Sequence, residues 1–113
     1  MFQSVTLNAL SSALDGLAAR QQAIAQNIAN VNTPNYRART VSFENALAQS
    51  VAAGSGVAGP TETASAAPSQ QNGNNVSLDS ETLNNVQTVL MYRFAAQAVN
   101  MDFDATSTAL KTA

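Results

Sequence analysis

The 113-residue sequence contains no cysteine and no histidine. It therefore has no disulfide, no thiolate nucleophile and no imidazole to serve as an acid, a base or a metal ligand. Charged residues are also scarce, at 11% of the chain, against about 25% in an average domain. Five basic and seven acidic residues give a net charge of -2, a poor match for nucleic acid. We expect a protein that is not an enzyme, with no metal, no cofactor, no nucleic-acid partner and no small-molecule substrate.

Long apolar runs are missing as well. No run of the sequence approaches the roughly 18 to 20 residues that span a bilayer. The first residues, MFQSVTLNALSSALDG, lack a basic segment in front of an apolar core. We expect neither a cleaved signal peptide nor a transmembrane anchor.

Two small charge clusters do not change this view. Asp102 and Asp104 are two positions apart, and side chains at that spacing point in different directions on a helix. The pair is therefore a poor candidate for a metal site or for acid catalysis. Arg37 and Arg39 lie beside Tyr36, but two arginines in an acidic protein are too few for a nucleic-acid site. Pairing with carboxylates of an adjoining subunit, or solubilising the turn, is the better interpretation.

The first third of the chain carries a heptad pattern. Apolar residues recur at alternating spacings of three and four, with Gln21 in the single gap. This spacing predicts a helix that packs as a coiled coil, extending through Val31. Thr33 and Pro34 are expected to end it, because the residue before proline disfavours the helical region. The predicted seam of this helix is Leu7, Leu10, Leu14, Leu17, Ile24, Ile28 and Val31.

A second long helix is predicted from about residue 80 to residue 112. Ser77 and Asp79 are possible N-caps, and Glu81 favours the positive end of the helix dipole. The apolar positions shift by one in the heptad frame near the middle, which resembles a stammer. The predicted seam of this helix includes Leu83, Val86, Leu90, Tyr92, Val99, Phe103 and Leu110.

The segment between the helices looks irregular. Residues 54–73 contain four glycines and two prolines among many serine, threonine and alanine residues, a composition typical of a loop. Before them, Val41, Phe43 and Leu47 are compatible with a short extended piece followed by a helical turn. We therefore predict an all-α fold whose terminal helices form an antiparallel coiled-coil hairpin. Its parts are an N-terminal helix and Asn-rich turn (1–39), a flexible loop (40–72) and a C-terminal helix with its capping segment (73–113).

The outer surface of the first helix is unusual. Between Val5 and Val31 its charged residues are Asp15 and Arg20, far fewer than a solvated coiled coil carries. Small alanines spread around the helix would let neighbouring helices approach closely. This favours several faces buried by other subunits, although alanine is also the best helix former on a solvated surface.

The end of the first helix carries a recognisable motif. Residues 27–39, NIANVNTPNYRAR, resemble the signature of flagellar axial proteins, which comprise rod, hook and hook-associated proteins. Asn35 stands where glycine is usual, and asparagine is the next best residue for a left-handed turn. Its asparagines either form a local capping cluster or bind neighbouring chains. The residues of this motif are Asn27, Ile28, Ala29, Asn30, Thr33, Pro34, Tyr36 and Arg37.

A second motif precedes the second helix. Residues 72–81, NGNNVSLDSE, resemble the entry to the C-terminal helix of the proximal rod proteins, most of all the B type. Ser77 replaces the usual aspartate and keeps a capping hydroxyl. Asn75 also begins a glycosylation sequon, which is too common to carry weight. The matching residues are Asn74, Asn75, Val76, Asp79 and Glu81.

The resemblance implies a structural subunit of the bacterial flagellar basal-body rod, the torque-transmitting drive shaft. It implies self-association and contact with other rod subunits, with the inner-membrane ring and with its rod adaptor. It also implies export through the flagellar type III apparatus without cleavage, and a periplasmic location. The alternatives are another rod or hook-family subunit, or a secreted helical adaptor of a related export system.

Overall fold

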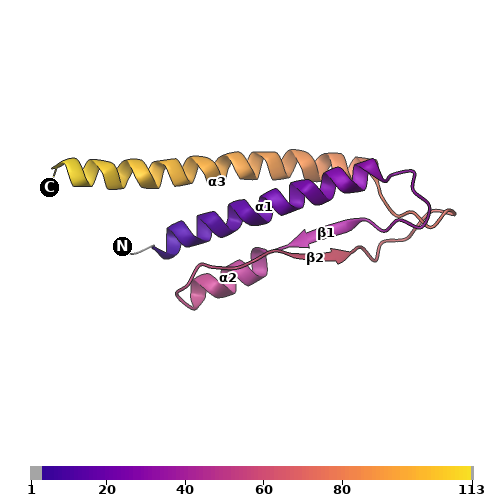
Figure 1. The fold of residues 1–113 in the computed structure, drawn as a ribbon, viewed down its shortest axis with the longest axis horizontal. Helices are drawn as coiled ribbons and strands as arrows, with labels where there is room; N and C mark the ends of the chain where they lie inside the picture. The colour runs from indigo at the N-terminus through magenta and orange to yellow at the C-terminus, as the bar shows by residue number, and fades with distance from the viewer. Residues whose placement is uncertain (1–3, 113) are drawn as a thin grey trace.

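The computed structural model describes residues 4–112, so residues 1–3 of the first predicted segment and residue 113 lie outside the description. Figure 1 shows two long helices side by side and antiparallel, with a small layer of strands and one short helix on the other side of the first. The molecule is elongated, with extents of 66 × 26 × 16 Å. In chain order the elements are α1 (Val5–Ala29), β1 (Arg39–Ser42), α2 (Glu44–Ala52), β2 (Thr61–Ala64) and α3 (Leu78–Thr112). Among the described helices, none is long and apolar enough to cross a membrane.

Local hydrogen bonds cap helix α1 at both ends. The Ser4 side chain caps its start by accepting a bond from the Leu7 amide at 3.0 Å. At its end the Asn30 amide donates to the carbonyls of Gln26 and Asn27 at 3.1 and 3.2 Å. The helix therefore ends two residues before the predicted Val31, and Pro34 lies in the turn that follows rather than at the helix end.

Helix α3 begins at the Ser77 cap. The Ser80 amide donates to the Ser77 hydroxyl at 3.4 Å. Of the two predicted caps, Ser77 is therefore confirmed, and Asp79 instead lies in the first turn with Glu81. Both acidic residues face the positive end of the helix dipole there.

The middle of the chain corrects the all-α prediction. Strands β1 and β2 form an antiparallel pair in which Arg39 is opposite Ala64 and Ser42 is opposite Thr61. The expected extended piece and helical turn are confirmed by β1 and α2, but residues 54–73 contain β2 and are not only loop. The strands form because α1 buries Val41 and Phe43, which turns a short β-prone segment into one face of a core.

The core lies where α1 crosses this layer. Leu17, Ala23, Val41 and Phe43 are buried together, and Leu47 packs against them. Gly16 makes the crossing possible, because a Cβ there would lie 2.5 Å from ring atoms of Phe43. The Arg20 guanidinium covers the same ring at 4.8 Å from its centroid, a cation–π contact.

Candidate functional site

Asn27, the first residue of the first motif, connects three elements of the fold. It is 1% exposed, and its amide nitrogen donates to the Arg39 carbonyl at 2.9 Å and to the Glu81 carboxylate at 3.1 Å. Its amide oxygen accepts bonds from the Arg39 amide at 2.8 Å and from the Tyr36 hydroxyl at 3.4 Å. One side chain therefore joins α1, β1 and α3, and none of its capacity is left for a neighbouring chain.

Asn74 does the same for the second motif. It is also 1% exposed, and its amide nitrogen donates to the carbonyls of Asn30 and Thr33, both at 2.8 Å. Its oxygen accepts a bond from the Val76 amide at 2.8 Å. Asn74 thus satisfies carbonyls freed where α1 ends, and it fastens the entry of α3 to the exit of α1.

Asn75 completes the connection. Its side-chain oxygen accepts a bond from the Ala38 amide at 2.6 Å, and its nitrogen donates to the carbonyls of Ser65 and Ala67 at 3.1 Å. The residue is buried. Because both ends of the amide are bonded inside the fold, the sequon at this position has no accessible acceptor.

The turn between the motifs depends on two unusual backbone conformations. Asn35 has φ of 62° and Gly73 has φ of 83°, which confirms the predicted left-handed turn at Asn35. The Asn35 amide donates to the Asn72 carbonyl at 2.8 Å. A Cβ on Gly73 would collide with the Asn35 side chain, so the two motifs meet at a point where only glycine fits.

Other motif residues lie at the surface. The Asn30 side chain donates to the Gln26 carbonyl at 2.8 Å and accepts from the Thr33 hydroxyl at 3.0 Å, which makes it a local cap. Arg37 donates to the Ala67 carbonyl at 3.0 Å. The exposed members of the two motifs are Ile28, Ala29, Thr33, Pro34, Arg37 and Asp79.

Glu81 is a buried acid at the start of α3. It is 6% exposed, and its second carboxylate oxygen, Oε2, has no hydrogen-bond partner among the described residues. Desolvation raises the pKa of Glu81, and the hydrogen bond from Asn27 only partly opposes this. The sequence placed Glu81 in the first turn but gave no sign of its burial.

The predicted seam of α1 is partly buried in the chain. Leu17 and Ile24 are buried, and Ile28 is 38% exposed. The remaining members, which are half-buried, are Leu7, Leu10, Leu14 and Val31.

Most of the predicted seam of α3 is exposed in the single chain, and its role in assembly stays a prediction. Val99 is half-buried, whereas the other six members are exposed. The side of α3 that is buried instead carries polar and small residues, with Thr88 at 2% exposure and Ala95 packed against the core. The exposed members of the predicted seam are Leu83 (59%), Val86 (51%), Leu90 (58%), Tyr92 (38%), Phe103 (58%) and Leu110 (73%).

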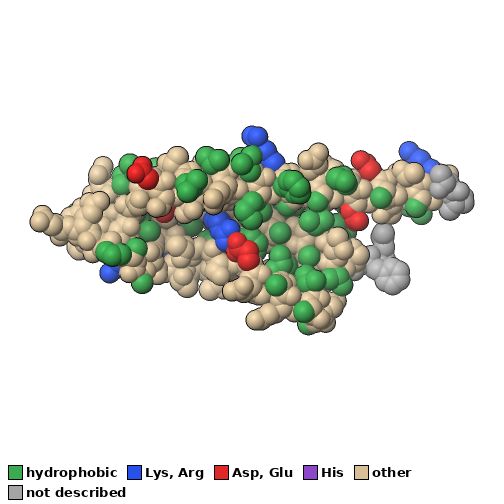
Figure 2. Space-filling view, turned by 180° about the vertical axis from the view of Figure 1, so that it is seen from behind, with side chains coloured by type: hydrophobic (Ala, Val, Ile, Leu, Met, Phe, Trp, Pro, Cys, Tyr) green, Lys and Arg blue, Asp and Glu red, His purple; other side chains and the backbone are tan. Residues whose placement is uncertain are grey.

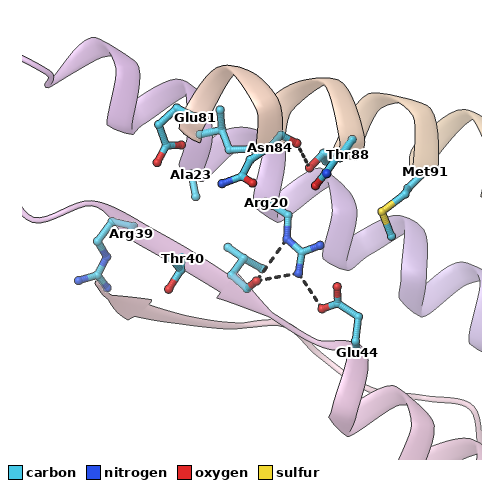
Figure 3. Close-up of a pocket in the computed structure, with 12 residues that line it drawn as sticks. Arg20, Ala23, Arg39, Thr40, Glu44, Glu81, Asn84, Thr88 and Met91 are labelled. Carbon is cyan, nitrogen blue, oxygen red and sulfur yellow. Dashed lines mark hydrogen bonds and ion pairs between the residues drawn. The ribbon is translucent and has the colours of Figure 1, made fainter. Parts of the chain in front are cut away.

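A groove lies between α3 and the strand layer. It has a volume of about 270 Å³ and is lined from α1, β1, α2 and α3 by residues that include Arg20, Arg39, Glu44 and Glu81. Figure 3 shows Arg20 reaching across it to Glu44, an ion pair of 2.7 Å. Arg20 also lowers the pKa of Glu44 by donating a hydrogen bond to it. The sequence did not indicate this groove, because its walls come from four separate elements.

Comparisons of the sequence with known proteins identify a family. Residues 7–37, which cover most of α1 and its exit turn, match the family model described as flagella basal body rod protein. The flagellar basal body rod protein FlgB of Bacillus subtilis (strain 168) is 33% identical, over 95% of this chain and 94% of the relative. The interlocked asparagines lie within this shared length. The chain therefore belongs to the FlgB family of flagellar basal body rod proteins.

Proposed function

We propose that this chain is a structural subunit of the bacterial flagellar basal-body rod and polymerises through its terminal helices. The observation that carries the proposal is an unpartnered apolar face on α3 in a chain of this family. Figure 2 shows hydrophobic side chains spaced along α3. Leu83, Val86, Leu90, Phe94 and Met101 are each more than half exposed.

These residues share one side of the helix. Their spacings of three, four, four and seven keep them within one face at 3.6 residues per turn. The face is opposite the one that contains Thr88, which is buried at 2% exposure. An apolar stripe of this kind on a small protein indicates an interface with another protein, and a helical stripe fits a coiled-coil contact with a neighbouring subunit.

The length of α3 supports the same proposal. It has 35 residues against 25 in α1, and its C-terminal end extends past the start of α1 (Figure 1). Among the described residues no other helix lies beside the extending part (Figure 1), so a neighbouring subunit would be the partner that buries Met101 and Phe103. A packed column of such helices would transmit torque as a drive shaft.

The remaining parts of the proposal follow from the resemblance. The subunit would pass through the flagellar type III apparatus without cleavage and assemble in the periplasm. Its partners would be further rod subunits, the inner-membrane ring and the rod adaptor of that ring. A thin core without disulfides is suited to a chain that is exported unfolded.

A deletion strain tests the proposal. We expect loss of swimming, and basal bodies that stop at the inner-membrane ring in electron micrographs. The strain should be complemented by the wild-type chain and by Asn100→Asp, which adds a charge at an exposed polar position of α3. Leu90→Asp should be secreted at normal levels without restoring rods. Intact rods in the deletion strain, or normal swimming with Leu90→Asp, would refute the proposal.

A further inference from the structure

The groove beside Glu81 contains a buried polar atom that has no hydrogen-bond partner among the described residues. Figure 3 shows the Glu81 carboxyl end pointing from α3 toward β1. One carboxylate oxygen accepts a bond from Asn27 at 3.1 Å, whereas Oε2 is buried without a partner among the described residues. A buried carboxylate oxygen with no donor is costly. A donor supplied from outside the chain would remove that cost.

The charges around the groove specify what kind of donor fits. Arg20 pairs with Glu44 at 2.7 Å, and Arg39 pairs with Glu62 at 2.9 Å. In Figure 3 the Arg39 guanidinium points away from Glu81. Each arginine that lines the groove is therefore already matched by a carboxylate, and ionised Glu81 leaves one negative charge in excess. The complementary group is a single cation.

We propose that this groove receives the Arg93 side chain of a second copy of the chain, with Glu81 as its acceptor. The inference rests on the proposed function and names the contact that the rod subunit would use. Arg93 is exposed, and no carboxylate lies within ion-pair distance of it in the part of the chain that the structure describes. A guanidinium suits such an interface, because it is more weakly hydrated than an ammonium group. The contact requires the Glu81 side chain to rotate so that Oε2 enters the groove.

The surroundings of Arg93 also resemble an interface. Leu90 lies three residues before Arg93 on the same side of α3 and is 58% exposed, so docking would bury it together with the arginine. Lys111, the other basic residue of α3, lies in its last turn and carries an ammonium group, which is more strongly hydrated than a guanidinium. Arg93 is therefore the better occupant of the two.

The positions of the groove and of Arg93 on α3 give the contact its geometry. Asn84 lines the groove, and Arg93 follows it by nine residues, which is about two and a half turns at 3.6 residues per turn. Glu81, the acceptor, precedes Arg93 by twelve residues, about three and a third turns, so donor and acceptor lie about 120° apart around one helix, on different surfaces. A contact between two different surfaces of identical subunits does not close on itself in a dimer, and it repeats as an open array or a ring. That is the type of contact an axial structure requires.

Cysteine cross-linking in cells tests the contact directly, since the chain has no cysteine of its own. Gln87 lines the groove, and Gln97 lies one turn beyond Arg93, so Gln87→Cys and Gln97→Cys place one thiol on each surface. We expect a covalent dimer in isolated basal bodies from the double variant and none from either single variant. Adding Glu81→Gln or Arg93→Gln should lower the dimer yield about tenfold or more, because each removes one partner of a buried charge pair. Adding both should lower it no further.

Lys111→Gln is the matched control and should leave the yield unchanged. Glu81→Gln keeps the shape of the side chain and its acceptor for Asn27, so a loss of yield reports the charge rather than misfolding. Should the double cysteine variant fail to build rods, Asn84→Cys replaces Gln87→Cys. Absence of a dimer in intact rods with both pairs, or a dimer that Arg93→Gln leaves undiminished, would overturn the contact while leaving the rod function standing. Intact rods in the deletion strain would instead refute the function.

Discussion

Asn27 satisfies both backbone polar groups of Arg39, accepting from the amide at 2.8 Å and donating to the carbonyl at 2.9 Å. A neighbouring strand would make the same pair of bonds along an open sheet edge. Arg20 continues the pattern by donating to the Val41 carbonyl at 2.8 Å. Helix α1 therefore covers the edge of β1 that β2 leaves free, which protects it from pairing with other strands.

We expect Asn27→Ala to destabilise the chain by about 2–4 kcal/mol, because it leaves several buried donors and acceptors without partners at a cost of about 1–3 kcal/mol each. Urea unfolding of the purified chain, followed by circular dichroism at 222 nm, measures the change. Asn32→Ala is the control, since Asn32 is an exposed asparagine of the same motif, and it should cost less than about 0.5 kcal/mol. Equal costs for the two variants would show that the amide of Asn27 does not hold the elements together.

Features governed by neighbouring residues could be predicted from the sequence. The Ser77 cap and the left-handed Asn35 follow from local rules about side-chain hydrogen bonds and backbone sterics, and the structure confirms both. The long helices follow from heptad spacing in the same way. The family resemblance added the asparagine positions, but it did not say whether they point inward or outward.

Features that depend on distant partners could not be predicted. Strand β2 is fully exposed and rich in threonine, and it exists because β1, about twenty residues earlier, offers an edge. The apolar pattern of α3 did not reveal which side of the helix packs against the rest of the chain. Glu81 and Thr88 are buried instead, and each is held by a hydrogen bond that no periodicity reveals.

Gly16→Ala should destabilise the chain although alanine is the better helix former. The new Cβ would lie 2.5 Å from Phe43 ring atoms, and overpacking of a core costs about 1–3 kcal/mol. We expect a net loss of about 1 kcal/mol or more in urea unfolding. Gly59→Ala is the matched control, because no atom lies within 4 Å of its added Cβ. If Gly16→Ala stabilised the chain, the close approach of α1 to Phe43 would be wrong.

Glu81 should make the stability of the chain fall as the pH rises. Burial raises the pKa of Glu81, so the folded chain binds more protons than the unfolded one around that pKa. The stabilisation from protonated Glu81 is complete below the pKa that Glu81 has in the unfolded chain. It is lost as the pH rises through the pKa that Glu81 has in the folded chain. Glu81→Gln stays neutral, so we expect a flatter stability curve and a more stable chain at pH 7.

The measurement is urea unfolding at a series of pH values from 4 to 8. Glu44 contributes with the opposite sign, because Arg20 lowers the pKa of Glu44 and its contribution is lost as the pH falls through the folded pKa. Glu44→Gln as a second variant isolates that part. If the free energy of unfolding changed with pH equally in Glu81→Gln and in the wild type, the Glu81 carboxyl would not be buried with a raised pKa.

Two leucines separate packing within the chain from packing between subunits. Leu17 is 2% exposed and Leu90 is 58% exposed, and both lie inside long helices, so replacement by alanine changes helix propensity equally. Leu17→Ala should cost about 2–5 kcal/mol in urea unfolding of the single chain, and Leu90→Ala less than about 1 kcal/mol. In cells we expect the Leu90→Ala protein to fold and to be secreted, but to build fewer rods than the wild type. A Leu90→Ala cost as large as that of Leu17→Ala would mean that α3 turns its apolar face toward α1 after all.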